Sequence, residues 1–137
     1  MKTDFKLVYM TTIPVRWGDM DSLAHVNNTV YFRYMEQSRV EWFALGSFNN
    51  HSLGNGPVLA HAECNFRKPV LYPSTVEVRL YCGMPGNTSL PLFQEIRVVG
   101  DEQTIYADGK SRVVWFDHQQ GKTISVPEGL RKLVQEK

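Results

Sequence analysis

The chain has 137 residues, with 15 basic and 14 acidic side chains and a net charge of +1. This balance offers neither the basic patch of a nucleic-acid-binding protein nor a polybasic membrane anchor, so we expect no nucleic-acid partner. No apolar run approaches the roughly 20 residues of a membrane span, and the first residues lack a signal-peptide pattern. The two cysteines do not form a disulfide framework. We therefore expect one domain over residues 1–137, located in the cytoplasm.

The first expected element is a strand over residues 9–17, because apolar side chains alternate there. The residues on its apolar face are Tyr9, Ile13, Val15 and Trp17. Pro14 removes one backbone donor from the ladder, which favours a position at the edge of a sheet.

A long helix is expected over residues 28–45, where side chains recur at helical spacing. The residues on one face of this helix are Tyr31, Met35, Ser38, Trp42 and Leu45. Asn27 or Asn28 can cap its first turn, because a short side-chain oxygen accepts an unpaired backbone N–H.

Four more strands are expected, joined by short turns, and a short helix follows Pro127. Their ranges are 57–67, 75–82, 90–99 and 104–116. Short turns connect antiparallel neighbours, so this order predicts an α+β fold with one antiparallel sheet. Three small residues, Ala107, Gly109 and Ser111, share one face of the last strand. We expect them to let the long helix lie close to the sheet.

The loop over residues 16–28 holds the residues best suited to chemistry. Asp19 or Asp21 could act as nucleophile or general base, although aspartate is also a common turn residue. His25 could orient a substrate or relay a proton, or bond to loop backbone. The positive N-terminal end of the following helix could polarise a carbonyl oxygen.

We expect neither a metal nor a cofactor. His61 and Cys64 are close in sequence, but they point to opposite faces of a strand, and no second ligand pair has zinc-like spacing. Phosphate-binding glycine loops are absent. Arg67 and Lys68 could contact a phosphate or form an ordinary solvated strand end.

Three segments together resemble the signature of the 4-hydroxybenzoyl-CoA thioesterase family. They are residues 15–21, residues 25–28 followed by 31–39, and residues 66–73. This family contains hotdog-fold acyl-CoA thioesterases. The resemblance implies an antiparallel five-stranded sheet wrapped around one long central helix. It also implies an acyl-CoA substrate and a homodimer or homotetramer with its active sites at the dimer interface.

The resemblance also implies roles for individual residues. Asp21 matches the catalytic aspartate, Asp19 becomes structural, and the carbonyl-polarising backbone N–H falls near Asn28. His25 occupies a position that is often polar. Relatives usually have glycine where this chain has Ala24, which would be strained if the backbone there needs a positive φ.

The substrate contacts follow from the same resemblance. His25 and Asn27 are expected to orient the acyl group or a water, and the acyl chain to lie along the helix against Tyr31 and Tyr34. Arg67 and Lys68 are expected to meet the CoA phosphates. Alternatives are a carrier-protein thioesterase or dehydratase on the same fold, and a non-catalytic acyl-CoA-binding protein.

Overall fold

The computed structural model describes residues 4–48 and 54–135. The strands are β1 (Lys6–Pro14), β2 (Asn55–Ala62), β3 (Asn65–Phe66), β4 (Thr75–Cys82), β5 (Ser89–Val98), β6 (Ala107–Asp117) and β7 (Lys122–Thr123). The helices are the 3₁₀ turn η1 (Trp17–Asp19), α1 (Asn28–Leu45) and α2 (Glu128–Gln135). The strands form an antiparallel sheet in the order β1–β4–β5–β6–β2.

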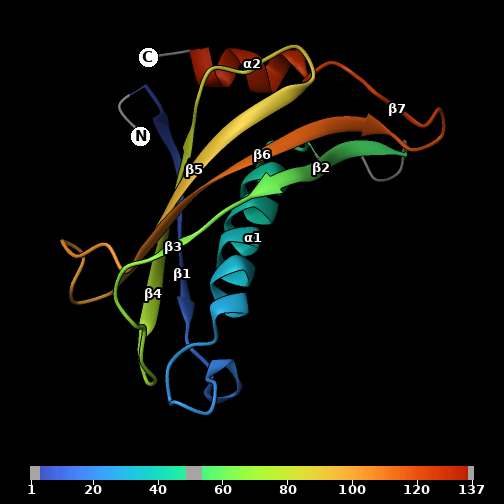
Figure 1. Cartoon of the computed structure of the whole chain (residues 1–137). Helices are drawn as coiled ribbons and strands as arrows, with labels where there is room; N and C mark the ends of the chain where they lie inside the picture. Colours follow the sequence, from blue (N-terminus) through green and yellow to red (C-terminus); the bar gives the residue numbers. More distant parts are fainter. Residues whose placement is uncertain (1–3, 49–53, 136–137) are drawn as a thin grey trace.

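Helix α1 lies along the inner side of the curved sheet (Figure 1). It has the bounds expected from the sequence, and Asn27 is its N-cap. Seven of its residues are buried: Tyr31, Tyr34, Met35, Ser38, Arg39, Trp42 and Phe43. They meet the inward side chains of β4 and β5, such as Val76, Val78 and Ile96, which are fully buried. Burial of these apolar faces holds the helix on the sheet.

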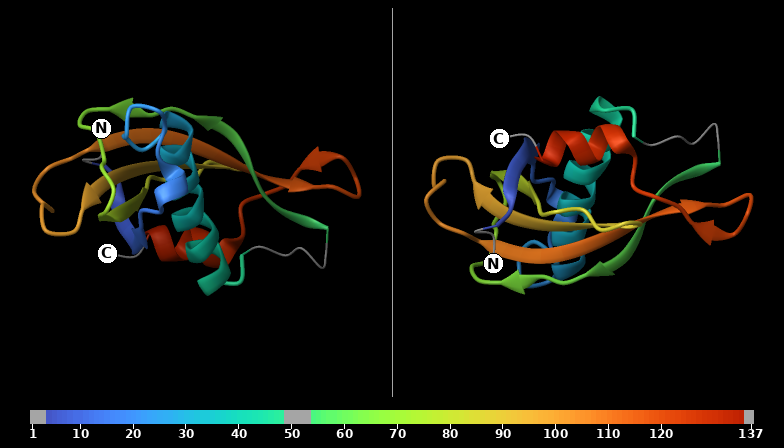
Figure 2. Two further views of the ribbon diagram at one scale, coloured as in Figure 1. Left: turned by 90° about the horizontal axis from the view of Figure 1, so that it is seen from below. Right: turned by 90° about the horizontal axis from the view of Figure 1, so that it is seen from above.

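Helix α2 closes the end of the core that lies beside the C-terminal half of α1 (Figure 2). Its Leu130 and Val134 join a cluster that contains Trp42 of α1 and Trp115 of β6. No helix in residues 4–48 and 54–135 is both long and apolar enough to cross a membrane.

The sheet has seven strands rather than the five expected. The additional two, β3 and β7, have two residues each and both pair with β6. β3 arises because the strand expected over residues 57–67 breaks between Ala62 and Asn65. The chain there crosses Gly109 so closely that a Cβ on Gly109 would collide with the carbonyl oxygen of Glu63.

This crossing also corrects the role expected for the small residues of β6. The backbone of Glu63 and Cys64, rather than α1, makes the close approach at Gly109. Ala107 is in the core cluster that includes Tyr31 of α1, and Ser111 bonds to Gln94.

The strand expected over residues 9–17 ends at Pro14, and Trp17 is 73% exposed instead of sharing the inner face. Asp19 causes this difference, because it closes the η1 turn. Its Oδ2 accepts the backbone N–H of Arg16, and its own N–H donates to the Arg16 carbonyl. The last long strand starts at Ala107 rather than at residue 104. Asp101 holds the preceding segment in a turn by accepting the hydroxyls of Thr104 and Tyr106.

Both cysteines are free thiols on the inner side of the structure. Cys82 is buried in β4, and Cys64 is half-buried against the core beside α1. Burial raises the pKa of Cys64 to about 11 and that of Cys82 to about 12.

Candidate active site

A cavity of about 330 Å³ lies where the loop after η1, the first turn of α1 and the segment after β3 meet. Its lining residues are Asp21, Leu23, His25, Val26, Asn28, Tyr31, Phe66, Arg67, Lys68 and Pro69. Of the seven site residues named from the sequence, the structure brings six together here. Asn27 is the exception.

Asp21 turns the loop and keeps one carboxylate oxygen free. Its Oδ1 accepts the backbone N–H groups of Leu23 at 2.9 Å and His25 at 3.4 Å. No hydrogen bond within the described residues engages Oδ2. The tight turn places Ala24 at φ 62°, in the left-handed region where a side chain is unfavourable. Position 24 therefore does need a positive φ, as expected if relatives have glycine there, and Ala24 adopts it.

Asp19 has a different environment from Asp21. It is buried, and its Oδ2 accepts the Tyr34 hydroxyl at 2.8 Å as well as the Arg16 N–H at 3.0 Å. Burial raises the pKa of Asp19, but the bonds and the Arg16 charge outweigh it, so the pKa lies below its ordinary value. Asp19 thus ties the loop to α1. Tyr34, expected beside the acyl chain, is not among the residues that line the 330 Å³ cavity.

The N-terminus of α1 has a free backbone donor at Asn28, a residue that lines the cavity. Asn27 caps the helix, because its Oδ1 accepts the N–H and hydroxyl of Thr29 and its carbonyl accepts the N–H of Val30. The N–H of Asn28, the first helical residue, has no acceptor among the described residues. The cap therefore leaves this donor available at the positive end of the helix.

His25 and Tyr31 form part of the wall around these two groups. The backbone of His25 pairs with Asp21, and its ring makes no hydrogen bond within the described residues. The Tyr31 hydroxyl accepts the N–H of Val70 at 3.0 Å. Burial raises the pKa of Tyr31, so the phenol stays protonated and keeps its own hydrogen to donate.

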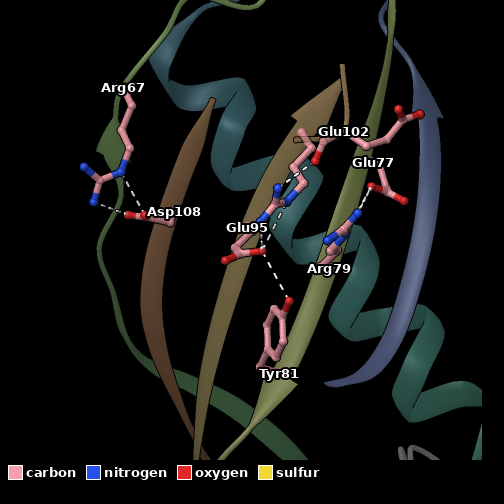
Figure 3. A network of polar contacts seen from close by, with 8 residues as sticks. Arg67, Glu77, Arg79, Tyr81, Glu95, Glu102 and Asp108 are labelled. Carbon is pink, nitrogen blue, oxygen red and sulfur yellow. Dashed lines mark hydrogen bonds and ion pairs between the residues drawn. The ribbon is translucent and has the colours of Figure 1, made fainter. Parts of the chain in front are cut away.

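Arg67 and Lys68 line the cavity but each already has an acidic partner. Arg67 forms a two-point contact with Asp108, at 2.8 and 3.1 Å, on the outer side of the sheet (Figure 3). Lys68 lies 3.7 Å from Asp101 and over the Tyr106 ring. Both side chains are about half exposed. A phosphate would have to compete with these carboxylates.

Sequence reasoning did not assign a site role to Leu23, Phe66 or Pro69. Leu23 and Phe66 are 74% and 45% exposed, and the Phe66 ring packs edge-on against Tyr31 with centroids 5.0 Å apart. Large apolar side chains left exposed next to a polar cavity are typical of a binding surface. The sequence could have indicated a site role for Phe66, because it directly precedes Arg67 in the segment 66–73 that resembles the family.

No group of three or more His, Cys, Asp or Glu side chains within residues 4–48 and 54–135 could hold a metal ion. The cavity instead joins a free carboxylate oxygen to a free backbone N–H. A carboxylate can attack or deprotonate, and a fixed N–H at a helix end can stabilise a developing oxyanion. This combination suits acyl transfer to water.

Solved structures with clear sequence similarity share this architecture. A candidate thioesterase of Pseudomonas aeruginosa is 40% identical, with a TM-score of 0.90 over 94% of this chain and 99% of that one. A candidate acyl-CoA thioesterase of Xanthomonas campestris is 36% identical, with a TM-score of 0.73 over 82% and 95% of the two chains.

An uncharacterised Bacillus subtilis protein, YsmA, is 24% identical over 66% of this chain. The matches to two curated relatives span only 60% and 54% of those relatives' lengths.

The curved sheet and the helix on its inner side define a hotdog-fold protein. Residues 15–134 match the thioesterase-like superfamily. The chain belongs to this superfamily.

Proposed function

We propose that this protein is an acyl-CoA thioesterase. The reaction consumes water: the carbonyl carbon–sulfur bond breaks, a carbon–oxygen bond to the oxygen of water forms, and the sulfur leaves as the thiol of CoA. The observation that carries the proposal is the pairing of two free groups in one cavity, Oδ2 of Asp21 and the N–H of Asn28.

Asp21 is the reacting carboxylate in this proposal. It either attacks the thioester carbonyl or takes a proton from the attacking water. The N–H of Asn28 stabilises the oxyanion that forms on the carbonyl. His25 orients the water or the acyl group, and Asn27 contributes by capping the helix so that the Asn28 donor stays free.

Coenzyme A is the proposed thiol. The Xanthomonas relative at 36% identity is a candidate acyl-CoA thioesterase, and the loop motif resembles the 4-hydroxybenzoyl-CoA thioesterase family. Tyr31 and Phe66 would contact the acyl group. Arg67 and Lys68 would meet the CoA phosphates by exchanging their partners Asp108 and Asp101 for a more highly charged group.

Replacing Asp21 with Asn tests the proposal. The amide cannot act as nucleophile or base, so kcat/KM for a hydrolysed acyl-CoA should fall by about 10²- to 10⁴-fold. Release of free thiol from a panel of acyl-CoA and acyl-carrier-protein thioesters measures the loss and shows which thiol carrier is preferred.

Asp117→Asn is the matched control. Asp117 also uses Oδ1 to accept two backbone N–H groups in a turn, those of Gln119 and Gln120, but it does not line the cavity. This variant should keep its activity. Undiminished turnover by Asp21→Asn, or tight CoA-ester binding by the wild type without thiol release, would contradict the proposal.

We propose a homodimer or homotetramer as the working assembly. Among the residues that the structure describes, β2 is an edge strand whose one partner is β6. Its neighbouring residues Val58 and Leu59 are 37% and 46% exposed, so both of its faces reach the surface. An exposed apolar edge strand favours association with a second chain.

A further inference from the structure

Arg39 is a buried cation that lacks a carboxylate partner. The residue is 8% exposed, and its Nη1 donates to the neutral Oε1 of Gln94 at 3.1 Å. The acid that influences it, Glu36, is bonded to Arg33 at 2.9 Å. No carboxylate among the described residues forms an ion pair with Arg39. A buried charge without a partner is costly, which suggests that a ligand supplies the missing charge.

The structure holds the Arg39 guanidinium in place through Gln94. This buried amide donates to the Met35 carbonyl and to the Ser38 hydroxyl, each at 2.7 Å. Its oxygen also accepts the Ser111 hydroxyl at 3.4 Å. Every buried side-chain nitrogen and oxygen in the described residues has a partner, so the nitrogens of Arg39 without one, Nε and Nη2, are not fully buried.

Arg39 lines a cavity of about 220 Å³ between α1 and β2. The other lining residues are Glu36, Val40, Phe43, Pro57, Leu59 and Val113. All of these except Glu36 are apolar. The cavity therefore resembles a site for an apolar chain, with two charged side chains, Glu36 and Arg39, in its wall.

One row of residues on α1 runs from the candidate active site to this cavity. Residues four apart on a helix lie on one face, and Asn28, Phe32, Glu36 and Val40 form such a row. Asn28 lines the active-site cavity, whereas Glu36 and Val40 line the Arg39 cavity. Between them, the Phe32 ring lies 6.4 Å from that of Phe66.

The length of this row sets the size of the group that could reach Arg39. Arg39 follows Asn28 by 11 positions (39 − 28), which is about 16 Å of helix. If the thioester carbonyl lies at the Asn28 N–H, a short or single-ring acyl group would not reach Arg39. An extended aliphatic chain would.

We propose that Arg39 is a specificity-determining residue that binds a carboxylate at the far end of a long acyl chain. The substrate class is the CoA thioester of an α,ω-dicarboxylic acid. This inference rests on the proposed thioesterase function. A guanidinium can bind a carboxylate through two parallel hydrogen bonds, which a methyl end cannot form.

Paired substrates test the inference directly. Mono-CoA thioesters of dicarboxylic acids are compared with unsubstituted acyl-CoAs of the same carbon number over a series of lengths. At the length that spans the distance from Asn28 to Arg39, the terminal carboxylate should raise kcat/KM about tenfold or more, because hydrogen bonds to charged groups are strong. Short chains should show no such preference.

Non-hydrolysable thioether analogues separate this inference from the proposed function. Their dissociation constants, measured by calorimetry, should show the same preference for a carboxylate end even if no thioester is cleaved. Absence of hydrolysis for every ester would contradict the proposed function, and equal binding of both ends at all lengths would overturn the inference.

Two variants locate the preference at Arg39. Arg39→Gln should abolish it. Because Arg39 is buried, Arg39→Gln could also disturb folding, so a second variant is made at an exposed position. Val40 is 52% exposed and lines the same cavity. The carboxylate of Val40→Glu would pair with the Arg39 guanidinium and compete with the substrate. Val40→Gln is the matched control, since it loses the same apolar contact without adding charge.

The Val40→Glu variant should show at least a tenfold smaller carboxylate preference than Val40→Gln. The molecular mass in solution is measured for each variant. If Arg39→Gln changes the mass of the assembly and leaves the preference intact, Arg39 pairs with a carboxylate of a second copy and the inference is wrong.

Discussion

Asp19 and Asp21 are two residues apart but have opposite surroundings. Asp19 is buried and its carboxylate accepts two hydrogen bonds, from the Arg16 N–H and the Tyr34 hydroxyl, whereas Asp21 lines a cavity and keeps one oxygen free. The residue types alone did not separate them. The family resemblance favoured Asp21. We propose the same assignment, since a buried carboxylate held by structural hydrogen bonds is poorly placed to react.

Asp19→Asn should lower the free energy of unfolding by about 1–3 kcal/mol at pH 7, because a buried hydrogen-bonded charge is lost. The pKa of Asp19 is lowered in the folded state, so its stabilisation is present above the ordinary pKa of about 3.9 and disappears as the pH falls through the folded value. Urea unfolding at several pH values measures this. The difference between wild type and variant should shrink below about pH 4, and a constant difference would contradict the assignment.

At the scale of elements, local sequence predicted most helices and strands but not where they cross. The pattern of residues 28–45 was sufficient for α1 because apolar spacing and an Asn cap coincide there. The break between β2 and β3 has no comparable local signal, since residues 57–67 alternate without interruption. It follows from the crossing over Gly109, a contact between residues far apart in sequence.

The same distinction applies to the candidate site. Asp21, His25 and Asn28 are close in sequence, so one loop and one helix end predicted their neighbourhood. The Arg39 cavity could not be predicted in this way, because its walls come from α1, β2 and β6.

Gly109→Ala should be strongly destabilising, because the added methyl group would meet the Glu63 carbonyl oxygen and backbone would have to move. We expect a loss of about 1–3 kcal/mol or more in the free energy of unfolding, measured by chemical denaturation. Gly18→Ala is the control, since a Cβ there has no neighbour within 4 Å. Equal stability of the two variants would show that the segment between β2 and β3 does not cross Gly109 as described.

For the whole molecule, the exposed edge at β2 is the feature that most favours assembly. Light scattering after size-exclusion chromatography should give two or four times the mass of one chain. Val58→Lys should shift the protein toward the monomer, because burying an unpaired ammonium in an interface is costly. Met84→Lys is the control: Met84 is 67% exposed in the turn after β4, away from β2. A monomeric wild type, or a Val58→Lys variant of unchanged mass, would contradict the assembly proposal.

The pKa values of the two thiols bear on how the proposed thioesterase activity can be assayed. Only thiolates react quickly with disulfide reagents, and a pKa of about 11 for Cys64 and about 12 for Cys82 leaves almost no thiolate at neutral pH. The chain contains no other cysteine. The folded protein should thus react very slowly with a chromogenic disulfide, so any colour that develops with an acyl thioester would come from a released thiol rather than from the protein.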